Sequence, residues 1–70
     1  MPLTIAPVNK KMKVLKVLAE EKIRRHLENL GILAGGCVTV LSSDGGSVIC
    51  MVKESRLALD KQLALKIFVA

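Results

Sequence analysis

Residues 22–35, KIRRHLENLGILAG, contain a short helix, its end and the start of a turn. Ile23, Leu27 and Leu30 recur at the spacing i, i+4 and i+7, which places them on one face of a helix. Gly31 follows the last of them, and glycine readily takes the left-handed conformation that ends a helix. The sequence therefore predicts a short helix, closed by this glycine, that packs as a plug against a small sheet.

Runs of aliphatic and β-branched residues on both sides of the helix predict strands. Residues 12–18, MKVLKVL, mostly alternate, and the adjacent Val14 and Leu15 break the alternation as a β-bulge or burial on both faces does. Residues 37–42 and 47–53 alternate on either side of the turn sequence DGG. Such a turn between two alternating runs predicts a β-hairpin.

The spacing of this hairpin also predicts which side chains share a face. With a loop over residues 44–46, Val40 faces Cys50 and Ser43 faces Ser47; a two-residue loop would shift the pairing by one. Cys37 then lies on the opposite face from Cys50, so we expect no disulfide between them within one chain. The five apolar residues that share one face in this register are Val38, Val40, Val48, Cys50 and Val52.

The two ends of the chain are expected to complete the sheet. Residues 3–5 are assigned to a short first strand or an arm, residues 56–59 to a fourth strand and residues 67–69 to the last strand. Between the last two, Asp60 is suited to cap one helical turn over residues 61–66. Several short strands around a small core predict a mainly β fold: a small, partly open barrel of about five strands with one α-helix and a short helical turn.

The composition bounds what such a chain can do. Its 70 residues suffice for one domain, residues 1–70, and 51% of them are hydrophobic. A body of this size buries only about 60% of the surface that its unfolded chain exposes. We therefore expect an exposed apolar patch or a partner that covers it, and a homo-oligomer is compatible with this surplus. No apolar run approaches the ~20 residues that span a bilayer, and no basic region precedes the apolar N-terminus, so a cytoplasmic protein is expected.

The net charge of +5 includes a cluster of lysines near the N-terminus. Phe68 is the only aromatic residue, so almost no side chain is available for stacking on bases. This favours a solvated strand edge over a nucleic-acid-binding surface. The clustered residues are Lys10, Lys11, Lys13 and Lys16.

No catalytic set of residues can be assembled, so we do not expect an enzyme. His26 is the only histidine, and with Cys37 and Cys50 it makes up the candidate metal ligands. Their spacing matches no recognised metal motif. The simpler interpretation is a histidine beside arginines, a surface thiol at Cys37 and a buried thiol at Cys50.

The motif R-x-L-x-x-L-G-I-x-x-G over residues 25–35 resembles the helix-and-turn signature of the FeoA family, the ferrous iron transport protein A family. The hairpin residues V-x-V and V-x-C-x-V resemble its central hairpin, and residues 56–59 with Ala64, Ile67 and Val69 resemble its closing segment. The chain departs from the family pattern in three places. Ala34 stands where proline is frequent, Glu54 where glycine is frequent, and the hairpin tip is short.

The resemblance implies an SH3-like domain, similar also to the C-terminal domain of DtxR-type repressors. It implies a cytosolic accessory protein that docks on and modulates FeoB, the membrane transporter of ferrous iron. It also implies that a transition metal, iron or zinc, is a candidate ligand, although no ligand set of the family maps onto these residues. The alternatives are a stand-alone metal-sensing regulatory domain and a small nucleic-acid-binding barrel.

The surface expected to meet the partner combines a basic part of the helix with the turn that follows it. Leu33 is expected to be exposed in this turn, beside two consecutive glycines, and two arginines lie outside the apolar helix face. The residues of this predicted partner surface are Arg24, Arg25, Leu33, Ala34, Gly35 and Gly36.

Overall fold

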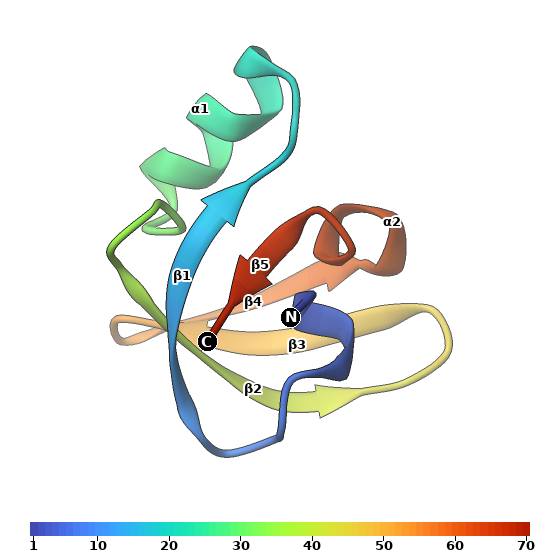
Figure 1. Ribbon diagram of the computed structural model, residues 1–70. Coiled ribbons are helices and arrows are strands. Elements are labelled where there is room, and N and C mark those ends of the chain that lie inside the picture. Colours follow the sequence, from blue (N-terminus) through green and yellow to red (C-terminus); the bar gives the residue numbers. More distant parts are fainter.

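Five antiparallel strands form one curved sheet in the order β4-β3-β2-β1-β5, with α1 at one end of it (Figure 1). The computed structural model describes residues 1–70. The mainly β fold, with one longer and one very short helix, is the predicted one. The elements are η1 (Leu3–Ile5, a 3₁₀ turn), β1 (Lys11–Val17), α1 (Glu21–Asn29), β2 (Cys37–Ser43), β3 (Ser47–Val52), β4 (Ser55–Asp60), α2 (Lys61–Ala64) and β5 (Ile67–Val69).

The core contains only apolar side chains, and no polar or charged residue is buried. The five residues predicted to share one face of the hairpin are each at most 2% exposed, which confirms the predicted alternation. Leu3 from η1, Leu27 from α1 and Ile67 from β5 fill the space above this face. The core is therefore built mainly from branched aliphatic residues, with Met12, Cys50 and two alanines among them.

The end of α1 has the geometry that the sequence predicted. Gly31 has a φ of +102°. Its N–H donates to the carbonyl of Glu28 at 3.0 Å, and the N–H of Ile32 donates to the carbonyl of Leu27 at 2.9 Å. These two bonds form a Schellman motif, in which the residue after the glycine packs against the last helical turn. Leu27 and Ile32 are accordingly both buried.

α1 contacts the rest of the molecule through fewer residues than its periodicity predicted. Leu27 is buried and Ile23 packs against the core while half-buried, whereas Leu30 stays 36% exposed. The first turns of the helix stand away from the sheet (Figure 1). The helix thus plugs the sheet through its buried face and leaves its charged face in solvent.

Two strands are bulged. In β1 the pairing with β5 shifts between Val14 and Lys16 and Leu15 is exposed, so of the two predicted explanations the bulge is confirmed and burial on both faces is wrong. The β2–β3 hairpin also shifts, between Val40 and Ser42. A bulge of this kind increases the local twist and lets a small sheet curve toward a barrel.

The tip of the β2–β3 hairpin corrects the predicted register. Val40 faces Cys50 as expected, but Ser43 faces Val48 and not Ser47. The carboxylate of Asp44 accepts hydrogen bonds from the N–H of Gly46 at 2.9 Å and from that of Ser47 at 3.0 Å. Ser47 is therefore engaged by the turn, and the strand pairing is offset by one residue.

The N-terminal segment differs from its prediction as a strand or arm. Residues 3–5 form η1, and Leu3 is fully buried. Met1 makes the strand-like contacts instead, because its amino group donates to the carbonyl of Val69 at 2.8 Å and its carbonyl accepts from the N–H of Val69 at 2.7 Å. Pro2 then pairs with Phe68 in an isolated bridge.

The C-terminal third agrees with its prediction except for the position of one turn and the length of α2. The β3–β4 turn lies at Lys53 and Glu54, one residue earlier than expected, and Lys53 has a φ of +57°. α2 is confined to Lys61–Ala64, and its predicted cap is confirmed, since a carboxylate oxygen of Asp60 accepts from the N–H of Leu63 at 2.8 Å.

Gly31→Ala is expected to destabilise the fold more than Gly35→Ala. Backbone strain at a positive φ costs on the order of 1–3 kcal/mol, and both glycines have one, +102° and +92°. At Gly31 the added Cβ would also lie 2.8 Å from Cγ1 of Val52, whereas at Gly35 no atom lies within 4 Å. Urea unfolding of both variants measures the difference, and equal losses of unfolding free energy would contradict the steric part.

Candidate functional site

The turn that follows α1, residues 33–36, forms one wall of a hollow of about 320 Å³, here called the turn hollow. Leu33 is 41% exposed in this turn, and Ala34 and Gly35 are also exposed. The opposite walls come from β1, β2 and the end of β3. Among the residues that line the turn hollow are Lys11, Leu33, Gly36, Cys37, Met51 and Lys53.

Backbone hydrogen bonds tie the 33–36 turn to the sheet. The N–H of Gly35 donates to the carbonyl of Val14 at 2.9 Å, and the N–H of Val14 donates to the carbonyl of Gly36 at 2.8 Å. The N–H of Gly36 also donates to the carbonyl of Leu33 at 2.9 Å. Leu33 is therefore presented to solvent from a fixed turn, so a ligand would not have to order this segment.

The chemistry of the turn hollow is apolar and basic. Leu33 and Met51 supply apolar surface, Lys11 and Lys53 supply two ammonium groups, and no carboxylate is among the lining residues. Such a site favours a ligand that carries an apolar side chain flanked by negative charge. The apolar surface of the hollow would bind the side chain, and the two ammonium groups would attract the neighbouring charge.

The predicted arginines lie elsewhere. Arg24 and Arg25 are exposed on α1 and do not line the turn hollow. Arg25 pairs with Glu21 one turn earlier on the helix, so its charge is partly compensated, whereas Arg24 forms no ion pair. The structure thus gathers the turn residues of the predicted surface into one site and leaves its two arginines apart from it.

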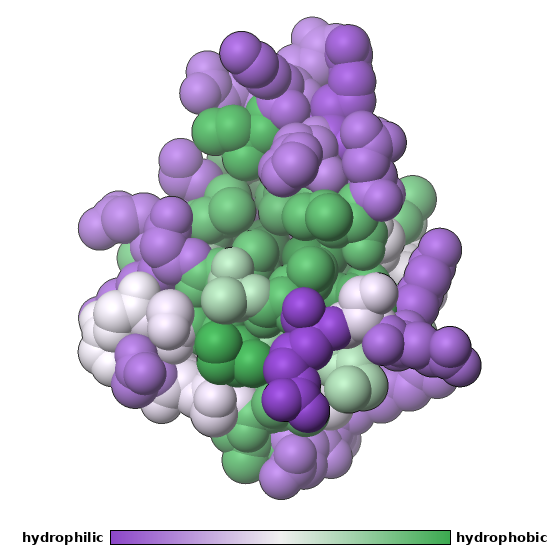
Figure 2. Space-filling model, turned by 180° about the vertical axis from the view of Figure 1, so that it is seen from behind, coloured by the Kyte–Doolittle hydropathy of each residue, from purple (hydrophilic) through white to green (hydrophobic).

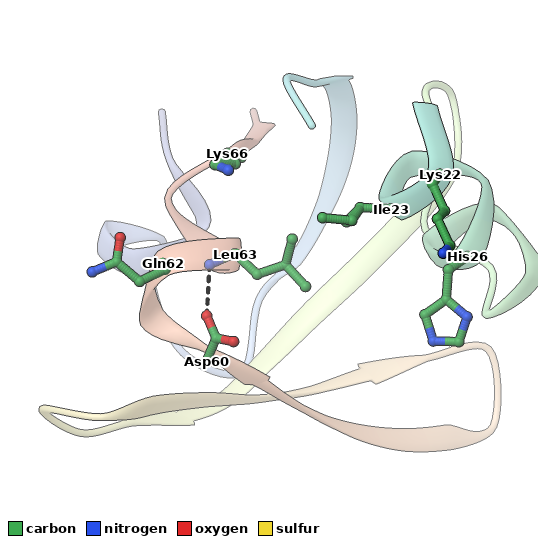
Figure 3. A pocket seen from close by; sticks show the side chains of 7 residues that line it. All are labelled: Lys22, Ile23, His26, Asp60, Gln62, Leu63 and Lys66. Atoms are coloured by element: carbon green, nitrogen blue, oxygen red, sulfur yellow. Dashed lines mark hydrogen bonds between the residues drawn. The ribbon is translucent and has the colours of Figure 1, made fainter. Parts of the chain in front are cut away.

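A second, more open groove of about 550 Å³ separates α1 from α2 (Figure 3). Ile23 and Leu63 point toward each other across it, and Lys22 and His26 lie on its α1 side. Its two walls are about forty residues apart in the chain, which is why no local motif indicated it. On the face opposite to that of Figure 1, an apolar area lies below α1 and is framed by hydrophilic side chains (Figure 2).

The three candidate metal ligands lie in separate environments. His26 is exposed on α1, Cys37 is exposed at the start of β2, and Cys50 is fully buried in β3. Burial raises the pKa of the Cys50 thiol, which disfavours the thiolate that binds metals. No three His, Cys, Asp or Glu side chains come together in a cluster. These residues therefore do not form one ligand set.

Sequence reasoning missed Lys11, Met51 and Lys53 as members of the turn hollow. They come from three segments that only the strand register brings together, with Lys11 opposite Thr39 and Thr39 opposite Met51. The sequence places Lys11 only among the clustered lysines of a solvated strand edge. Without the register of the whole sheet, its neighbour could not be identified.

Comparisons with known proteins agree with this geometry. The FeoA domain model matches residues 1–70. A crystal structure of an iron uptake regulatory protein (FeoA) is 28% identical, with a TM-score of 0.89, covering 99% of this chain and 93% of that chain. The FeoA protein from Chlorobium tepidum is 26% identical, with a TM-score of 0.84, covering 99% of this chain and 68% of that chain.

Iron(II) transport protein A from Clostridium thermocellum, at 17% identity and a TM-score of 0.88, shares the fold over 99% of this chain and 44% of that chain. A search of curated proteins finds no significant match. No helix has both the length and the apolar character needed to cross a membrane.

The two thiols are expected to react at very different rates. Cys37 is exposed and Cys50 is buried with a raised pKa. A disulfide reagent at about pH 8 should therefore modify one thiol in the folded protein and the second only after unfolding. Cys37→Ser should remove the fast reaction, and rapid modification of both thiols in the folded protein would contradict the burial of Cys50.

Proposed function

Since the chain belongs to the FeoA family, small proteins linked to ferrous iron transport, we propose that it is a cytoplasmic accessory protein that docks on the cytosolic part of a FeoB-type transporter and modulates iron uptake. The proposed role is recognition of a partner, without catalysis. The observation that supports it is the fixed 33–36 turn, which holds an exposed leucine against a hollow with two lysines.

The proposed contact places Leu33 at its centre. An exposed apolar side chain on a fixed turn loses little conformational freedom on binding, so most of its burial contributes to affinity. Lys11 and Lys53 lie at the same hollow and would attract carboxylates of the partner. Arg24, exposed and without an ion pair, extends the positive charge along α1.

Leu33→Glu is expected to weaken binding to the cytosolic part of the transporter by at least about tenfold, which corresponds to ~1.4 kcal/mol. It would remove the apolar contact and add a negative charge where an acidic partner binds. Leu65→Glu is the matched control, because Leu65 is 43% exposed, close to the 41% of Leu33, and does not line the turn hollow. Pull-down and calorimetry measure the affinities, and circular dichroism checks the fold.

Arg25→Glu tests whether the helix contributes to the same contact. It would reverse a charge on α1 and break the pair with Glu21. We expect weaker binding with a reduced dependence on salt, since a long-range attraction is lost. Unchanged affinity for both Leu33→Glu and Arg25→Glu would remove this surface from consideration.

A further inference from the structure

The two edge strands of the sheet differ in whether another segment of the chain covers them. The edge at β5 is covered by the N-terminus, because Met1 exchanges two backbone hydrogen bonds with Val69 and Pro2 pairs with Phe68. The edge at β4 has no such cover, since β3 is the only strand that pairs with it. An uncovered strand edge is a template on which another chain can pair.

The register identifies the backbone groups on this open edge. The N–H of Lys61 donates to the carbonyl of Gly46 at 3.3 Å, and hydrogen-bonded pairs alternate along an antiparallel ladder. Every second residue of β4 therefore bonds to β3, and the residues between them, Arg56, Ala58 and Asp60, direct their N–H and C=O groups away from it. The N–H groups of all three residues and the carbonyls of Arg56 and Ala58 make no hydrogen bond outside the regular elements. The carbonyl of Asp60 belongs to α2, because Asp60 is the N-cap of that helix and an N-cap carbonyl accepts the first helical hydrogen bond.

We propose that two copies of this chain pair antiparallel through β4, with a two-fold axis at Ala58. In this register Ala58 faces Ala58 of the partner subunit, and Arg56 faces Asp60 of the partner subunit, once on each side of the axis. The Ala58 pair exchanges both backbone hydrogen bonds, and each outer pair adds a bond from the N–H of Asp60 to the carbonyl of Arg56, because the carbonyl of Asp60 serves α2. The segment RLALD, residues 56–60, is thus complementary to itself.

Charge selects this register over its neighbours. Moving the axis by one residue, to Leu57 or Leu59, sets Arg56 or Asp60 against Ala58 of the partner subunit and loses both opposite-charge pairs. Moving it by two residues sets either Arg56 against Arg56 of the partner subunit or Asp60 against Asp60 of the partner subunit, and like charges directly opposite each other are unfavourable. Only an axis at Ala58 gives two opposite-charge pairs. The small side chain at the axis also avoids a clash with its own copy.

The surroundings of the edge permit this pairing. Arg56, Ala58 and Asp60 are exposed, while Leu59 is buried, so the pairing leaves the core unchanged. One carboxylate oxygen of Asp60 caps α2 through the N–H of Leu63. The other oxygen has no partner and is free to accept from a guanidinium group.

Ala58→Pro tests the backbone part of the proposal. Proline removes an N–H that faces outward and is tolerated in edge strands, so the β3–β4 ladder should survive. In sedimentation equilibrium up to about 1 mM, we expect the wild-type chain to dimerise and Ala58→Pro to remain a monomer. Ala34→Pro, in the exposed turn, is the control and should dimerise normally. A monomeric wild type, or a dimer that a folded Ala58→Pro leaves intact, would overturn the proposal.

Charge reversal tests the register. Arg56→Asp and Asp60→Arg each place like charges in both pairs, so each variant alone should dimerise at least about tenfold more weakly. Mixed together, the two variants again join an aspartate to an arginine in both pairs and should form a one-to-one dimer. Asp60→Arg also removes the cap of α2, so circular dichroism must show that it folds; should it not fold, Arg56→Asp and Ala58→Pro decide alone. Absence of the mixed dimer from folded variants would refute this register.

Discussion

The left-handed conformation at Gly31 is the constraint on which most of the structure depends. It ends α1 and turns the chain so that Leu27, before it, and Ile32, after it, both enter the core. The same turn delivers residues 33–36 to β1, where backbone hydrogen bonds fix them. Because an added Cβ would meet Val52 at 2.8 Å, close packing as well as dihedral preference requires glycine here. One position thus couples the helix, the core and the candidate docking turn.

A chain this small, with one aromatic residue, closes its sheet around a core of mostly aliphatic side chains. The bulge after Val14 lets β1 pair with β2 in its first half and with β5 in its second half. That bend brings the two pairings around one core, which Leu3 and Ile67 complete from the chain ends. The limited core leaves apolar side chains on the outside, and such surface is typical of proteins that bind partners.

The features that could be predicted from the sequence are those encoded locally. Alternation identified the buried face of the hairpin, a glycine marked the end of α1, and Asp60 marked the cap of α2. The features that could not be predicted depend on contacts between residues that are far apart in the sequence. Residues 3–5 carry an extended-looking sequence but coil so that Leu3 reaches the core, and Ser47 is drawn into the turn by Asp44. The site followed the same division: the 33–36 turn was identified as a candidate, whereas its lysine neighbours required the strand register.

The proposed docking turn and the proposed β4 edge use different parts of the molecule. The residues that line the turn hollow come from the segment after α1, from β1, β2 and β3, and from Lys53 in the β3–β4 turn, and they include none of Arg56, Ala58 or Asp60. In a dimer that pairs through β4, the turn hollows of both subunits would therefore lie outside the paired strands. A two-fold dimer would carry two identical docking turns, and two linked contacts raise the apparent affinity only for a partner that offers two sites at a compatible spacing. Dimerisation would thus select for a partner that is itself paired or clustered, without any change in the contact made by Leu33.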